Sequence, residues 1–186
     1  MRKKNKGSDQ FQIPLMHAFR DAFDAKDSKR KIDERVRGEK VISGRGSLKR
    51  RGASETILKR DLAIDLTSLV NTVDLGSAVD LTDLDFVSNS VLNFGLYDVA
   101  HLTSDEMAVN GIAADLVNAL VQHEPRINKE TLMVERSTEF DETSQKMRYE
   151  ISAEMLSKPL DIPLEFVAEV DVASGKVHLS QLTASR

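Results

Sequence analysis

The spacing of apolar residues changes along the chain from a helical period to a strand period. Before Pro125 apolar side chains recur every three or four residues, and after it they recur every second residue. The first pattern predicts amphipathic helices over residues 54–71, 86–94 and 103–124. The second predicts half-buried strands around residues 132–134, 147–155, 164–172 and 176–179. Helices followed by strands favour an α+β fold, with N-terminal helices packed on one face of a small antiparallel β-sheet whose other face stays polar.

Short sequence signals mark the ends of the predicted helices. Thr103 lies three residues before Glu106, which is the spacing of an N-terminal capping box. Pro125 ends the same helix, because proline cannot continue the backbone hydrogen-bond pattern. Gly95 follows the 86–94 segment and is expected to form a left-handed C-terminal cap. We expect Phe94, beside it, to pack back onto the helices.

A separate apolar stripe precedes these helices. Its members recur at four-residue spacing and are Phe11, Leu15, Phe19 and Phe23, with Met16 alongside. A helix this short is marginal in water, so it docks either on its own domain or on a partner. The charged residues 26–47 read as a flexible linker between it and a main domain of residues 48–182. We therefore interpret residues 1–25 as a docking helix that binds a partner subunit.

The charge of the chain is divided unevenly. The 186 residues carry a net charge of only −4, yet residues 1–60 hold 18 basic and 8 acidic side chains and residues 61–186 hold 8 and 22. The basic cluster of residues 49–51 with Lys59 and Arg60 invites comparison with nucleic-acid-binding proteins. No aromatic residue is interleaved between Val36 and Val73, however, and the folded part is acidic. These features argue against nucleic acid as a partner.

The sequence holds little that suggests catalysis or a cofactor. The absence of cysteine excludes disulfides, thiolate metal sites and a cysteine nucleophile. The histidines are far apart, without metal-ligand spacing, and we interpret each as a lone surface or helix-end residue; they are His17, His101, His123 and His178. Carboxylates are plentiful but form no recognisable pair, so the hydrolase class stays open on this ground alone. No apolar run is long enough to span a bilayer, and we expect a cytoplasmic protein without membrane insertion.

Three ordered motifs carry a resemblance to a known family. They are LKRDLAIDL at residues 58–66, SVLNFGLYD at residues 90–98, and the tripeptide Glu124-Pro125-Arg126. Their order and spacing resemble the GpW/Gp25 lysozyme-like family, and more narrowly its TssE branch, the baseplate wedge subunits of type VI secretion systems. Phe94 and Tyr97 stand where that family usually has tyrosine and proline.

The resemblance implies a structural role and no enzymatic activity or cofactor. It implies a wedge subunit of a contractile injection machine that seeds sheath assembly, located at a baseplate near the inner membrane. The implied partners are other wedge subunits of the TssF, TssG and TssK type and sheath subunits of the TssB and TssC type. By the same resemblance, Glu124, Pro125 and Arg126 contact the helical core bundle of the wedge. An alternative is that Glu124 and Arg126 only hold the turn of their own domain.

Two further readings stay open. One is the corresponding wedge protein of a contractile phage tail, and the other is a peptidoglycan hydrolase, which the family's lysozyme-like label suggests. For the structural role, a short sheet can accept strands from a neighbour along an unpaired edge. Val167–Val172 and Val177–Leu179 are the candidate strands near that edge. The alternative for them is that their inward side chains only close the core.

Overall fold

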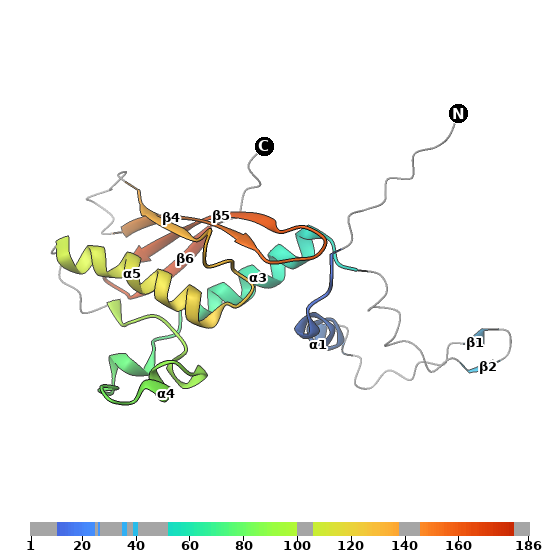
Figure 1. Cartoon of the computed structure of the whole chain (residues 1–186), viewed down its shortest axis with the longest axis horizontal. Helices are drawn as coiled ribbons and strands as arrows, with labels where there is room; N and C mark the ends of the chain where they lie inside the picture. Colours follow the sequence, from blue (N-terminus) through green and yellow to red (C-terminus); the bar gives the residue numbers. More distant parts are fainter. Residues whose placement is uncertain are drawn as a thin grey trace. The chain divides into compact units, whose positions relative to one another are not determined.

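The computed structural model describes residues 11–24, 26, 35–36, 39–40, 52–99, 106–137 and 146–180 (Figure 1). The helices are α1 (Leu15–Asp24), α3 (Glu55–Val70), α4 (Asp85–Ser88) and α5 (Glu106–His123), with 3-10 turns η2 (Leu75–Ser77) and η3 (Val91–Asn93). The strands are β1 (Arg35–Val36), β2 (Glu39–Lys40), β3 (Met133–Arg136), β4 (Lys146–Met155), β5 (Ile162–Asp171) and β6 (Lys176–Ser180). Residue contacts divide the chain into two compact units, Met1–Asp61 with Ser157–Leu160, and Leu62–Leu156 with Asp161–Arg186.

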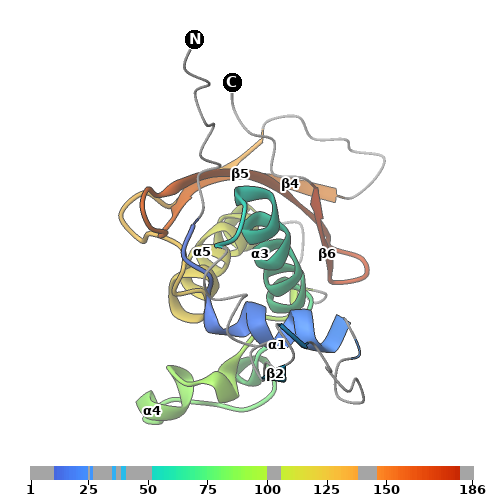
Figure 2. The same ribbon diagram turned by 90° about the vertical axis from the view of Figure 1, so that its right-hand side faces the viewer.

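The second unit contains a four-stranded antiparallel sheet in the order β3-β4-β5-β6. Its centre is the long pair of β4 and β5, which stay in register from Lys146 opposite Asp171 to Met155 opposite Ile162. Figure 2 shows the helical segments α3 and α5 side by side beneath the curved sheet. This arrangement confirms the predicted α+β fold with helices on one sheet face.

The core of this unit follows the two predicted periods. Along β4 buried and exposed residues alternate, so that one side of each strand faces the helices. From the helices, the buried leucines of α3 and α5 recur at three- and four-residue spacing. The side chains with almost no exposed surface include Leu62, Leu66, Ile112, Leu116, Leu120, Tyr149, Ile162, Leu164 and Val170. Burial of each such side chain stabilises the fold by about 1.5–3 kcal/mol.

The predicted helix over residues 86–94 is wrong in extent. Helix α4 ends at Ser88, and a separate 3-10 turn follows at Val91–Asn93. Between them Ser90 adopts an extended backbone, and its side chain accepts a hydrogen bond from the amide of Leu92. A serine that bonds its own neighbouring backbone competes with a continuous helix, which explains the break.

Gly95 has a different role from the C-terminal cap that the sequence predicted. Its φ of +143° lies outside the left-handed helical region, and it follows a residue with extended backbone. The amide of Leu96 donates to the carbonyl of Thr72 at 2.8 Å, and the amide of Asp74 donates to the carbonyl of Leu96 at 2.9 Å. A Cβ on Gly95 would lie 2.3 Å from the Thr72 oxygen. Glycine is therefore needed because two backbones approach closely here.

Helix α5 ends at His123, so only Glu124 lies between its last residue and the predicted stop at Pro125. The ring of Phe94 packs edge-on against His123, with ring centroids 5.3 Å apart, which confirms that Phe94 folds back onto a helix. Thr103, the predicted cap, lies outside the described residues. Most of the predicted linker of residues 26–47 lies outside them as well, although β1 and β2 form a two-residue pairing within it.

Within the described part of the chain, no helix is both long and apolar enough to cross a membrane.

We predict opposite effects of alanine at two glycines. Gly95→Ala should lower the free energy of unfolding by about 2–4 kcal/mol, because the methyl group meets backbone and φ is strained. Gly111→Ala is the matched control: it lies within α5 with nothing within 4 Å of the added methyl, and should raise stability by about 0.5–1 kcal/mol. Urea denaturation of both variants measures this. Equal effects at the two positions would contradict the close approach at Gly95.

Candidate functional site

The Glu124-Pro125-Arg126 motif forms a compact ion cluster at the end of α5. The Arg126 guanidinium donates through Nε to Glu124 Oε1 at 2.7 Å and through Nη2 to Glu124 Oε2 at 2.6 Å. The same Nη2 also donates to Asp65 Oδ2 of α3 at 2.6 Å. One guanidinium therefore binds two carboxylates, Asp65 from α3 and Glu124 from the residue that follows α5.

The cluster is largely removed from solvent. Glu124 is only 5% exposed. Because carboxylates are rarely buried without a partner, this burial depends on Arg126. Burial lowers the pKa of Arg126, but the hydrogen bonds and charges of Glu124 and then Asp65 outweigh it and hold the pKa above its usual value. Arg126 is thus a permanent cation. Asp65 was not predicted as a site residue; its position in the first motif was the only available signal.

The backbone of the motif joins α5 to the sheet. The Arg126 carbonyl accepts a hydrogen bond from the amide of Leu156 at 2.7 Å, and the Asn128 amide donates to the Glu154 carbonyl at 2.8 Å. Pro125 lies exposed at the turn. Glu124 and Arg126 therefore do hold the turn of their own domain. Their contact with a partner stays a prediction, with Pro125 as the exposed member of the three.

The N-terminal stripe is shorter than predicted. Helix α1 begins at Leu15, and Phe11 lies before it in an extended segment that pairs with Ala53 through two backbone hydrogen bonds of 3.0 Å. Phe11 is 8% exposed. Its predicted place on the partner-binding helix face is therefore wrong, because its side chain is buried within the first unit.

Helix α1 contacts the start of α3 through its polar side. His17 is 6% exposed, and its Nδ1 lies 2.6 Å from Asp61 Oδ2, while its Nε2 lies 3.2 Å from Asp21 Oδ2. Arg20 Nη1 donates to the Asp61 carbonyl at 3.0 Å. The interpretation of His17 as a lone surface residue is wrong: a ring with both nitrogens protonated can donate to both carboxylates. His123 at a helix end and exposed His178 match the sequence interpretation, and His101 lies outside the described residues.

The apolar side of α1 is consequently exposed. The residues on it are Leu15, Met16, Phe19 and Phe23, each at least 59% exposed, with Phe23 at 83%. An amphipathic helix normally buries its apolar stripe and exposes its polar one. In α1 the order is reversed, so three of the four predicted binding residues form a row of large apolar side chains open to a partner.

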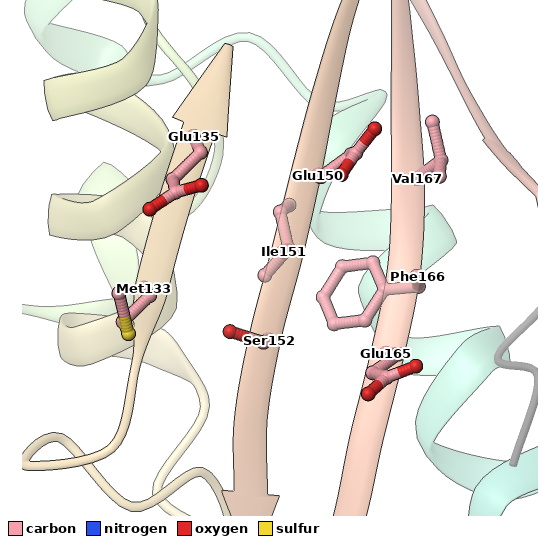
Figure 3. Close-up of a pocket in the computed structure, with 8 residues that line it drawn as sticks. All are labelled: Met133, Glu135, Glu150, Ile151, Ser152, Glu165, Phe166 and Val167. Carbon is pink, nitrogen blue, oxygen red and sulfur yellow. The ribbon is translucent and has the colours of Figure 1, made fainter. Parts of the chain in front are cut away.

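The outer face of the sheet carries a hollow of about 420 Å³ across β3, β4 and β5. Figure 3 shows Glu135, Glu150 and Glu165 on three neighbouring strands around it, with Met133 and Val167. Glu135 lies directly opposite Glu150 in the strand register. Like charges in such cross-strand positions repel, so this face favours a cationic group.

Strand β6 forms one edge of the sheet. Strand β6 pairs only with Val167–Asp171, so β6 does not extend along Ile162–Phe166 of β5. At Val177, on the outer edge of β6, the Asn71 side chain takes the place of a further strand. Its Nδ2 donates to the Val177 carbonyl at 2.9 Å, and its Oδ1 accepts from the Val177 amide at 3.2 Å.

The described residues include no group of three or more histidine, aspartate and glutamate side chains arranged to hold a metal ion.

Comparison with protein families gives one match. A family model described as baseplate wedge protein gp25 matches residues 56–160, which is more than half of the chain. The matched range contains all three sequence motifs and therefore confirms the predicted resemblance. Comparison with curated proteins found no match, and comparison with solved structures found none either.

We predict that Arg126→Ala lowers the free energy of unfolding by about 2–4 kcal/mol, because buried Glu124 loses its partner. Arg126→Lys keeps the charge but not the planar fork and should recover only part of this loss. The double variant Glu124→Gln with Arg126→Ala should be more stable than the sum of the single effects, with a coupling of about 1–3 kcal/mol. Thermal and urea denaturation measure the cycle. Additive effects would show that the two side chains do not act as a unit.

We predict that His17→Ala loosens the contact of α1 with α3, because it removes the bond to the Asp61 carboxylate and leaves that of Arg20 to the Asp61 carbonyl. Burial raises the pKa of Asp61, but the hydrogen bonds and charges of His17 and Arg60 outweigh it and hold the pKa below its usual value. The stabilisation that ionised Asp61 contributes is therefore lost as the pH falls below about 3.8. Hydrogen exchange of the α1 amides at pH 7 should be faster in His17→Ala. Unchanged exchange would mean that other contacts hold the helix.

Proposed function

Because the chain belongs to the gp25 family of baseplate wedge proteins, we propose that it is the wedge subunit of a type VI secretion machine that seeds the contractile sheath. The single observation that carries a baseplate role is the family match, which spans the Arg126 cluster and the sheet together. The TssE-like sequence at residues 90–98 supports the secretion machine over the corresponding role in a phage tail. Genes for the other wedge subunits beside this gene would separate the two.

The role is structural and consists of protein contacts. The surfaces available to the other wedge subunits include the end of α5 at Pro125 and the exposed apolar row of α1. The row suits a partner groove, since four large apolar side chains are presented by a helix whose position is fixed by polar bonds. We propose that α1 binds the wedge, with Leu15, Phe19 and Phe23 as its contact residues.

For sheath seeding, we propose that strands of sheath subunits add beside β6 and along the Ile162–Phe166 part of β5. These residues border the part of the sheet that β6 does not cover. Pro163 lacks an amide proton, so an added strand would form fewer hydrogen bonds at that position. The acidic outer face nearby favours sheath segments that carry lysine or arginine.

The test is co-expression with the wedge subunits encoded beside this gene, followed by affinity purification at moderate salt. The wild-type chain should purify in a stoichiometric complex. The double variant Phe19→Asp with Phe23→Asp should lower recovery of partners by at least about 10-fold, because each charge replaces an apolar contact. Leu160→Asp is the matched control, since Leu160 is 70% exposed in the same unit but lies outside α1.

A wild-type chain that purifies alone at every salt concentration would contradict the wedge role. A complex that forms equally well with the Phe19 and Phe23 variant would instead remove α1 from the interface and leave the wedge role standing.

A further inference from the structure

A second exposed apolar surface lies in the segment between α3 and α5. Its members are Leu84, Phe86, Val91 and Leu92, which we call the display loop. Phe86 is 95% exposed, Val91 82% and Leu92 68%. Single exposed apolar residues are ordinary. Several large ones within one short segment, residues 84–92, form an exposed apolar surface, which normally marks an interaction site.

The display loop is held in place by polar side chains beneath it. Asn93 accepts a hydrogen bond from the Gly76 amide at 2.9 Å and donates to the Ser88 carbonyl at 3.1 Å. From α5, Gln122 Nε2 donates to the same Ser88 carbonyl at 2.6 Å, and His123 Nε2 lies 3.1 Å from the Asn93 carbonyl. The apolar side chains are thus presented on a fixed backbone, which lowers the entropy lost when a partner binds.

The last turn of α5 contacts the display loop and leads directly into the Arg126 cluster. Gln122 and His123 hold the loop, and Glu124 and Arg126 follow immediately in the chain. A partner that meets the exposed turn at Pro125 therefore has the display loop within reach of the same contact.

The charge around the display loop selects the partner. Residues 61–125 contain eleven aspartates and glutamates and no lysine or arginine. Asp80, Asp83 and Asp85 are exposed within or next to the loop. Burial, and then the charge of Asp74, raise the pKa of Asp115 on α5. A partner surface gains most here if its apolar part is bordered by cations.

We propose that the display loop inserts Phe86, with Val91 and Leu92, into an apolar groove of another wedge subunit whose border carries lysine and arginine. The inference rests on the proposed wedge function and names the chemistry of its partner. The contact is by side chains: within residues 84–92 the structure has helical turns and no strand edge to extend. A phenylalanine so exposed acts as the anchor of such an interface.

The experiment uses the full chain co-expressed with the neighbouring wedge subunits. Phe86→Asp should leave the melting temperature within 2 °C of wild type, because the side chain is about fully exposed, and should weaken recovery of the partner by at least about 10-fold. Leu160→Asp adds the same charge at an exposed apolar site elsewhere and should retain the partner. Photo-crosslinking from p-benzoylphenylalanine at position 86 should capture a partner segment that combines apolar residues with lysine or arginine.

The outcomes separate the two levels of the proposal. If the wild-type chain forms no wedge complex, the wedge function itself fails. If the complex forms and Phe86→Asp leaves it intact, the display loop is not its contact and this inference is overturned alone. Crosslinks only to a second copy of the chain, or to a segment without lysine or arginine, also overturn it.

Discussion

The bond between Arg126 and its two carboxylates is the constraint on which the arrangement of the second unit depends. The guanidinium joins the end of α5 to α3 through Asp65 and neutralises Glu124, which is almost fully buried. The backbone of the same three residues continues into hydrogen bonds with the end of β4. Helix α3, the end of α5 and the sheet are therefore joined at one point, which fixes how the exposed surfaces near it are oriented.

The parts of this fold that depend on local spacing could be predicted from the sequence. The change from a helical to a strand period at Pro125 placed α5 and the alternating strands, because burial on one face imposes that period on the residues. The long-range contacts of Asp65, His17 and Asn71 could not be predicted in this way. Each of these meets a residue at least 44 positions away in the chain, and no local pattern records such a contact.

The errors have the same origin. The apolar spacing continues through Ser90 and so predicts one helix over residues 86–94, whereas the Ser90 side chain accepts a hydrogen bond from the Leu92 amide. The spacing of Phe11 fits the α1 stripe, but Phe11 pairs with Ala53 through its backbone and its side chain is buried. In α1 the spacing correctly predicts an apolar and a polar side, but it does not tell which side is buried. The contact of His17 with Asp61 shows that the polar side packs against α3. Spacing defines a face, and long-range polar contacts decide where it points.

Asn71 has a consequence for how this molecule behaves before it meets a partner. Its amide satisfies both backbone groups of Val177 at the open edge of the sheet. A second copy that approaches this edge gains no new hydrogen bond at Val177, so uncontrolled edge-to-edge pairing of two sheets is disfavoured. An incoming strand must first turn one side chain aside, a local rotation that leaves the helix and the sheet intact. The Asn71 side chain thus blocks the edge at Val177 reversibly. Only a strand that makes enough further contacts compensates for the two hydrogen bonds lost when this side chain moves away.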